Sequence, residues 1–220
     1  MGAHPSPERI TIAALAPQPW KNGAGLTREL AVGPRGADNA GFDWRISLAE
    51  VGRDAPFSAF PGIDRCITLL RGAGMRLASA DGSVDHRLDQ GLAPFRFAGE
   101  LALHATLFDG ACSDFNVMTR RGAWTAEVAI VRAACELVDA DVMLLLCAGG
   151  SWQIDAGATD HDAAWSLEPD AALLWRARCG TLWATPTTRP ITRPTTRPAE
   201  PLTTPQANAL LQVRLCQHPR

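Results

Sequence analysis

Side chains that can bind a carboxylate recur in short segments of this 220-residue sequence. They are Lys21, Asn22, Arg28, Arg45, Arg65, Asn116 and Arg120. A guanidinium presents a planar set of N–H donors that matches a carboxylate, and ammonium or amide groups add further donors. A pocket lined by several of these side chains would therefore favour a small acidic ligand.

Two predicted strands place further residues beside these groups. In residues 42–50, Arg45 and Ser47 alternate with apolar side chains and share the polar face, and in residues 115–119 Asn116 and Met118 share a face. If the two faces adjoin, they enclose a cavity that is half polar and half apolar. Aromatic residues beside prolines are candidates for its rim. We therefore expect ligand contacts from Trp20, Lys21, Asn22, Arg28, Arg45, Ser47, Phe60, Arg65, Asn116 and Met118.

The arginines also have a structural interpretation. Ion pairs with nearby carboxylates often brace loops and strands. Arg45, for example, has Asp43 and Glu50 close to it in the sequence. Bracing and ligand contact therefore both stay open for each arginine.

Catalytic groups are not identified by any motif. The sequence has no Gly-x-Ser-x-Gly turn, and no motif places His86 or His104 as a general base. The catalytic residues are therefore unknown, and whether the protein is an enzyme stays open.

The histidines do not form a metal-binding pattern. All five are isolated, whereas many metal-binding β-barrel proteins use a His-x-His pair with a carboxylate and a later histidine. After the turn at residues 72–74, where such a protein supplies its first ligands, the chain reads Met-Arg-Leu-Ala. We expect no metal and no other cofactor, unless His86 and His104 converge.

The pattern of apolar residues predicts an all-β fold. Short apolar runs alternate with Gly, Pro, Asp and Asn clusters, as in a sandwich or barrel, and helical periodicity is almost absent. The segment 66–74 is echoed about 76 positions later by residues 142–150, and residues 92–97 are echoed by 167–172. This repeat indicates two duplicated β lobes.

We expect an N-terminal lobe at residues 1–120 and a C-terminal lobe at 121–185, with strands exchanged between them. The Thr-Arg-Pro repeat at 186–205 favours an extended linker. Residues 206–220 form a short C-terminal segment whose apolar spacing is compatible with a helix.

Composition restricts the partners. The formal net charge is -2 and there is no basic block, which argues against nucleic acid. No stretch approaches the roughly 20 apolar residues of a membrane-spanning helix. Six widely spaced cysteines fit free thiols in the cytoplasm. Assembly into a homo-oligomer stays open.

Five motifs in order resemble the HutD/Ves family: residues 20–30, 42–47, 56–65, 95–99 and 114–121. The first begins Trp-Lys-Asn-Gly and the third reads Pro-Phe-Ser-Ala-Phe-Pro-Gly-Ile-Asp-Arg. The resemblance covers residues 10–185 and implies a bicupin, a pair of fused β-barrel or jelly-roll lobes, with an association with histidine utilisation.

The resemblance and the cationic motifs together predict a metal-independent binding or regulatory protein. Its ligand would be a small carboxylate such as urocanate or an N-formyl-glutamate-like acid. Two alternatives stay open: an enzyme acting on a small acidic or amide substrate, and a protein-interaction module that uses an exposed sheet or the Thr-Arg-Pro tail.

Overall fold

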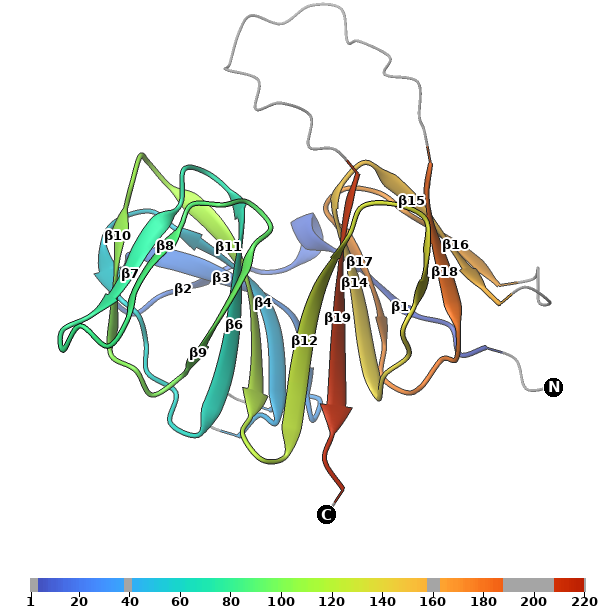
Figure 1. Ribbon diagram of the computed structural model, residues 1–220, viewed down its shortest axis with the longest axis horizontal. Coiled ribbons are helices and arrows are strands. Elements are labelled where there is room, and N and C mark those ends of the chain that lie inside the picture. Colours follow the sequence, from blue (N-terminus) through green and yellow to red (C-terminus); the bar gives the residue numbers. More distant parts are fainter. Residues whose placement is uncertain (1–3, 38–40, 158–162, 188–207, 220) are drawn as a thin grey trace, which may run out of the picture. The chain divides into compact units, whose positions relative to one another are not determined.

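The computed structural model describes residues 4–37, 41–157, 163–187 and 208–219. These residues form β-sheets, and the helical element among them is a single 3-10 turn, η1 (Ile12–Ala14) (Figure 1). Val, Ile, Leu and aromatic residues in short runs suit pleated, buried strands, and the intervening Gly and Pro residues suit tight turns. The predicted all-β fold is confirmed.

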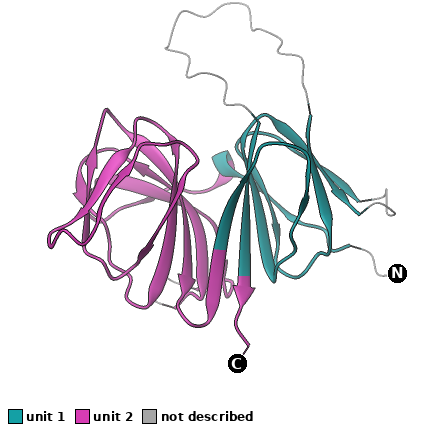
Figure 2. Cartoon of the chain, in the orientation of Figure 1, with its two compact units in different colours: residues 1–13, 127–215 teal, residues 14–126, 216–220 magenta. Residues whose placement is uncertain are grey.

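Two compact units make up the chain (Figure 2). The N-terminal unit comprises Ala14–Ala126 and Cys216–Arg220, and the C-terminal unit comprises Met1–Ala13 and Glu127–Leu215. The units divide the chain near residues 13, 126 and 215, whereas the lobes were expected to end at 120 and 185. The first residues of the chain belong to the C-terminal unit because the first strand pairs there.

The N-terminal unit contains a six-stranded and a four-stranded sheet. The larger has the order β2 (Gln18–Pro19), β3 (Gly25–Gly33), β4 (Trp44–Val51), β11 (Cys112–Arg120), β6 (Ile63–Arg71) and β9 (Pro94–Ala98). The smaller has the order β5 (Ala55–Pro56), β10 (Leu103–Leu107), β7 (Met75–Ser79) and β8 (Asp85–Leu88). Neighbouring strands run antiparallel in both sheets.

The C-terminal unit also contains strands from a larger and a smaller sheet. The larger has the order β1 (Glu8–Thr11), β17 (Ala171–Trp175), β14 (Val142–Gly149), β19 (Ala209–Gln217) and β12 (Trp124–Val131). The smaller has the order β13 (Cys135–Leu137), β18 (Leu182–Thr187), β15 (Ser151–Ala156) and β16 (Ala164–Leu167). A cluster of buried side chains including Leu145, Trp152, Leu173 and Leu182 joins strands of the two sheets.

The same strand connectivity occurs twice. Strands β4 to β11 give the neighbour orders β4-β11-β6-β9 and β5-β10-β7-β8. Strands β12 to β19 repeat both orders, each strand lying eight places later in the chain: β12-β19-β14-β17 and β13-β18-β15-β16. The sequence repeat falls on this equivalence, because it aligns β6 with β14.

The described part of the C-terminal segment is a strand and not the helix with which its apolar spacing is compatible. Residues 209–217 form β19, which lies between β14 and β12. Leu210, Leu211 and Val213 are fully buried, so the segment needs apolar side chains on both faces. A short continuous apolar run of this kind does not distinguish a central strand from a buried helix by periodicity.

The expected Thr-Arg-Pro linker lies mostly outside the described residues; its first two residues, 186 and 187, end β18. No helix in the part of the chain that the structure describes is long and apolar enough to span a membrane.

Candidate functional site

The N-terminal unit holds a cavity of about 540 Å³. Strands of the six-stranded sheet form one wall, and the loop before β3 and the segment after β5 form the rest. Its lining consists of Gln18, Pro19, Trp20, Lys21, Asn22, Thr27, Arg45, Ser47, Ala49, Pro56, Phe57, Ser58, Ala59, Phe60, Arg65, Asp114, Asn116 and Met118.

The loop between β2 and β3 carries Trp20, Lys21 and Asn22 to the cavity. A turn closes it, because Gly23 N donates to Trp20 O at 2.9 Å and Trp20 N donates to the carbonyl of Gly25 at 2.9 Å. Gly23 has φ +65°, which a residue with a side chain rarely adopts. At Gly25 an added Cβ would lie 2.3 Å from a β4 carbonyl oxygen, so only glycine fits.

Trp20 is fixed in place by two contacts. Its indole Nε1 donates to Thr27 Oγ1 at 2.8 Å, and its ring meets the Phe57 ring edge to face at a centroid distance of 6.1 Å. An aromatic side chain with its polar atom satisfied forms a rigid cavity wall.

The polar wall arises from the register of three neighbouring strands. Met118 of β11 lies opposite Arg45 of β4 on one side and Arg65 of β6 on the other. Asn116 lies opposite Ser47. The adjacency of the two predicted polar faces is therefore confirmed, whereas contact with a ligand stays a prediction.

Apolar clusters flank this wall at both ends. One includes Ile67 and Leu69 of β6 and Cys112 of β11. The other includes Ile63 of β6 and Met118 of β11. On β6 and β11 the cavity's charged or amide residues therefore lie between apolar neighbours, which strengthen electrostatic interactions at these positions.

Arg45 is buried and paired at the cavity. Its Nε donates to Glu29 Oε2 at 2.8 Å, and only 9% of its side chain is exposed. Neither Asp43 nor Glu50, the partners suggested by the sequence, forms this pair. The Arg45 side chain is thus held in one orientation while it lines the cavity.

Arg65 lies among aromatic rings. Its guanidinium carbon is 5.3, 5.6 and 5.0 Å from the ring centroids of Phe57, Phe60 and Phe97, which places it within cation–π range of all three. Its NH1 donates to Ser58 O at 3.2 Å. Burial lowers the pKa of Arg65 from 12.5 to about 10, so the group stays charged at neutral pH.

Asp114 is the most unusual residue of the site. It is fully buried, and neither carboxylate oxygen has a well-formed hydrogen bond within the described residues. Burial raises its pKa from 3.8 to about 7, although the charge of Arg65 and the nearby Asn116 amide lower it. The group therefore titrates near neutral pH.

Nine of the ten residues expected to contact a ligand line this cavity. The exception is Arg28, whose NH1 pairs with Glu50 on the exposed side of the sheet. Arg120 likewise serves as a brace, since its Nε donates to Asp43 Oδ1 at 3.0 Å.

Sequence reasoning did not include Asp114 among the ligand contacts. Its signal was available, because it precedes Asn116 by two positions and so shares a face with it and with Met118. The predicted strand began at residue 115, whereas β11 begins at Cys112. Because the predicted strand began three residues too late, Asp114 was not assigned to the face that carries Asn116 and Met118.

The two histidines that could have converged lie on opposite faces of the smaller sheet. His86 pairs in register with Leu77 and stacks on Phe95 at 3.7 Å, whereas His104 pairs with the next residue of β7, Ala78, and is exposed. Among the described residues, no three His, Cys, Asp or Glu side chains lie together as a metal site would require.

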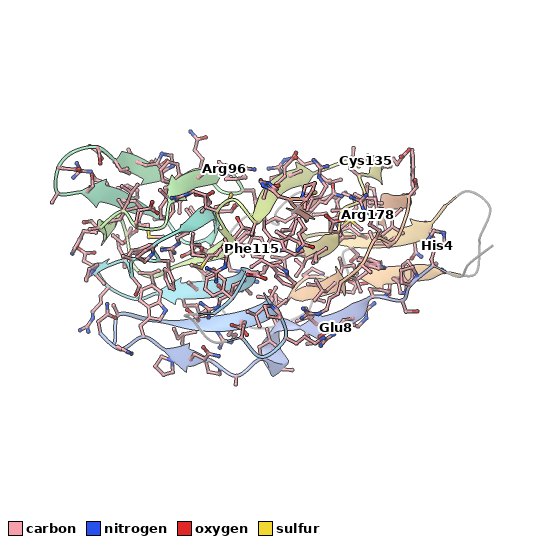
Figure 3. The ribbon with its side chains drawn as sticks, turned by 90° about the horizontal axis from the view of Figure 1, so that it is seen from below. His4, Glu8, Arg96, Phe115, Cys135 and Arg178 are labelled. Atoms are coloured by element: carbon pink, nitrogen blue, oxygen red, sulfur yellow. The ribbon has the colours of Figure 1, made fainter. Side chains whose placement is uncertain are left out.

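Figure 3 shows the side chains on both units, with Arg96 and Phe115 labelled on β9 and β11. Phe115 is fully buried and lies next to Asp114 in the sequence, so it points to the opposite face of β11. Along β11, residues of the cavity wall thus alternate with residues of an apolar, buried face.

The strand orders and the interior cavity define the class of protein: an all-β protein with the cupin fold. A cupin barrel domain protein from Leptotrichia buccalis superposes with a TM-score of 0.52 and 6% identity, covering 97% of this chain and 98% of that chain. HutD from Pseudomonas fluorescens SBW25 superposes with a TM-score of 0.75 and 24% identity, covering 97% of this chain and 100% of that one.

The sequence comparison is more specific. The profile of the HutD family matches residues 13–189, so the chain belongs to the HutD family. Protein Ves of Escherichia fergusonii is 38% identical over 161 residues, which cover 72% of this chain and 82% of that protein.

Proposed function

We propose that the cavity of the N-terminal unit binds a small carboxylate without the help of a metal ion. The observation that carries the proposal is that two buried arginines, Arg45 and Arg65, face one cavity. Arg65 Nε lacks a hydrogen-bond partner within the described residues. A carboxylate would supply that partner and balance the charge.

The division of roles between the arginines follows from their surroundings. Glu29 already neutralises part of the Arg45 charge, so Arg65 is the principal anchor and Arg45 the second. Lys21 and Asn22 lie on the loop at the exposed side of the cavity, where they add donors. The volume of about 540 Å³ falls in the range of about 300–1,000 Å³ that is common for small-molecule sites.

The family resemblance suggests which acids to test. Urocanate and N-formyl-glutamate are small carboxylates linked to histidine utilisation, and each carries a carboxylate that the cavity arginines could bind. A cytoplasmic protein that senses such an intermediate would have a regulatory role.

Calorimetry with both acids tests the proposal, and Arg45→Ala is the informative variant. A charge-assisted contact is worth about 1.5–3 kcal/mol, so the affinity should fall roughly 10- to 100-fold. Glu29 loses its partner but is 29% exposed on its side chain and can be hydrated, so the variant should fold. Arg28→Ala is the matched control, because Arg28 forms an ion pair outside the cavity. Absence of binding by every acid tested, or equal losses in both variants, contradicts the proposal.

An enzyme acting on a small acidic or amide substrate is the second candidate, and Asp114 is the observation that favours it. A carboxyl group with a pKa of about 7 is suited to general acid or base catalysis. Incubation with each acid followed by mass spectrometry separates the two candidates, since a sensor returns its ligand intact.

A further inference from the structure

The cavity contains acceptors as well as donors that lack partners. Besides Arg65 Nε, both carboxylate oxygens of Asp114 and Oδ1 of Asn116 have no well-formed hydrogen bond among the described residues, and all of these atoms are buried; the Asn116 amide lies near the Asp114 carboxyl without forming one. Native proteins leave few buried polar atoms unsatisfied, because each one loses its hydration. Their concentration in one cavity therefore needs an explanation.

These atoms occupy adjoining parts of the cavity wall. Asp114 and Asn116 are two residues apart on β11 and point to the same face. Arg65 comes from the neighbouring strand β6, where it lies opposite Met118. The wall thus presents a cation beside a group of hydrogen-bond acceptors.

The duplicated connectivity provides an internal comparison. Asp114 lies opposite Leu69 of β6, and Gln212 lies opposite Leu145 of β14, the residue that the repeat aligns with Leu69. Gln212 is also buried, but its amide donates to Val138 O at 2.9 Å. The C-terminal unit therefore satisfies its polar group at this position from within the protein, and the N-terminal unit does not.

A carboxylate ligand alone cannot satisfy these acceptors. It offers only acceptor oxygens itself, and above about pH 7, where Asp114 is ionised, the two carboxylates would place like charges together. A ligand that also carries an N–H would meet both needs, because the N–H donates to Asp114 while the carboxylate accepts from Arg65.

We propose that the cavity selects carboxylic acids that also carry an N–H donor, with the carboxylate at Arg65 and Arg45 and the N–H directed at Asp114 and Asn116 Oδ1. This inference rests on the proposed carboxylate binding and adds the class of ligand. Asp114 is then the residue that determines specificity, since it distinguishes such acids from carboxylates of the same shape that have no donor.

Paired ligands test the selection directly. Calorimetry on the full chain compares urocanate with 3-(1,3-oxazol-5-yl)acrylate, in which a ring oxygen takes the place of the N–H and the second ring nitrogen is kept. The measurements are made at about pH 8, where imidazole is neutral and keeps one N–H. A second pair compares N-formyl-glutamate with the ester analogue in which oxygen replaces the N–H. In at least one pair the N–H acid should bind about 10- to 100-fold more tightly, as a hydrogen bond to a charged group implies.

Asp114→Ala should remove this preference. The ratio within the pair should fall to about threefold or less. The acid without the N–H should keep or gain affinity, because its contacts to the arginines remain and the negative charge of Asp114 is gone. Asp109→Ala is the control, since Asp109 is an exposed aspartate outside the cavity and its removal should leave the ratio unchanged. Thermal unfolding of each variant establishes that it is folded.

The outcomes separate this inference from the proposed function. If acids with and without the N–H bind the wild-type protein equally, the selection is overturned while carboxylate binding stands, even if Asp114→Ala cannot be purified. If Asp114→Ala keeps the wild-type ratio, Asp114 is not the specificity determinant. If none of the four acids binds, the proposed function fails and this inference fails with it.

Discussion

Asp114→Asn should change how the stability of the N-terminal unit depends on pH. The pKa of this carboxyl is 3.8 in an ordinary environment and about 7 in the folded protein, where burial disfavours the charge. Because the folded state holds the proton more tightly, the free energy of unfolding falls as pH rises from about 4 to about 7 and is level above that. The difference between the two pKa values corresponds to on the order of 4 kcal/mol in total.

The variant lacks the titrating group, so this decrease should be absent from it. Between about pH 5 and about pH 8, the stability of Asp114→Asn relative to wild type should rise by roughly 2–3 kcal/mol. Any constant cost or gain of the amide cancels in this comparison. Urea unfolding followed by tryptophan fluorescence measures it, and the other ionisable groups cancel between the two proteins.

Asp109→Asn is the control, because it removes an exposed carboxylate of the same unit. It should follow the wild-type pH dependence. If Asp114→Asn does so as well, Asp114 ionises freely in the folded state, and the description of a buried carboxyl without a hydrogen-bond partner is wrong.

Three further predictions concern the fold. Gly25→Ala places a Cβ 2.3 Å from a backbone oxygen and should lower the free energy of unfolding in urea by about 1–3 kcal/mol. Gly52→Ala is the control: its Cβ would have no neighbour nearer than 3.6 Å, so the free energy of unfolding should hardly change. Leu211→Ala should cost about 2–5 kcal/mol, as expected for a fully buried leucine in a central strand, and a cost near zero would contradict the placement of β19. Burial raises the pKa of the Cys112 thiol to about 11, so at about pH 8 this thiol should react with a disulfide reagent only after the protein unfolds. The partly exposed Cys216 should react in the native protein.

The sequence predicted the strands well where apolar and polar residues alternate. In residues 44–51, alternation correctly separated Arg45 and Ser47 from Trp44 and Ile46. It did not reveal that both faces of this strand are buried, because the period fixes which residues share a face but not what covers each face.

Elements that depend on distant partners were harder to predict. The two-residue strands β2 and β5 have no period to detect and exist through their pairing with β3 and β10. The C-terminal strand β19 pairs with β14 across a long sequence separation, and no local signal indicates that pairing.

The candidate site was likewise predicted in part: local sequence identified the residues that line the cavity but not the residues they pair with. Side-chain chemistry identified Arg45, Arg65 and Asn116, and all three line the cavity. Their partners could not be derived: Glu29 is separated from Arg45 by 16 positions, and a register shift in β3 between residues 29 and 31 sets their alignment.

The buried polar wall between two apolar clusters implies a trade-off between stability and function. A protein selected only for stability would fill this cavity with apolar side chains, since buried groups without partners reduce the free energy of unfolding. The repeated strand set in the C-terminal unit has an apolar core with Leu145, Leu173 and Trp152, and its buried Gln212 is hydrogen-bonded. One copy of the duplicated fold can therefore supply a robust core while the other retains groups that reduce its own stability. Variants of the N-terminal unit that are repacked in the manner of the C-terminal unit should be more stable and should lack the carboxylate binding proposed above.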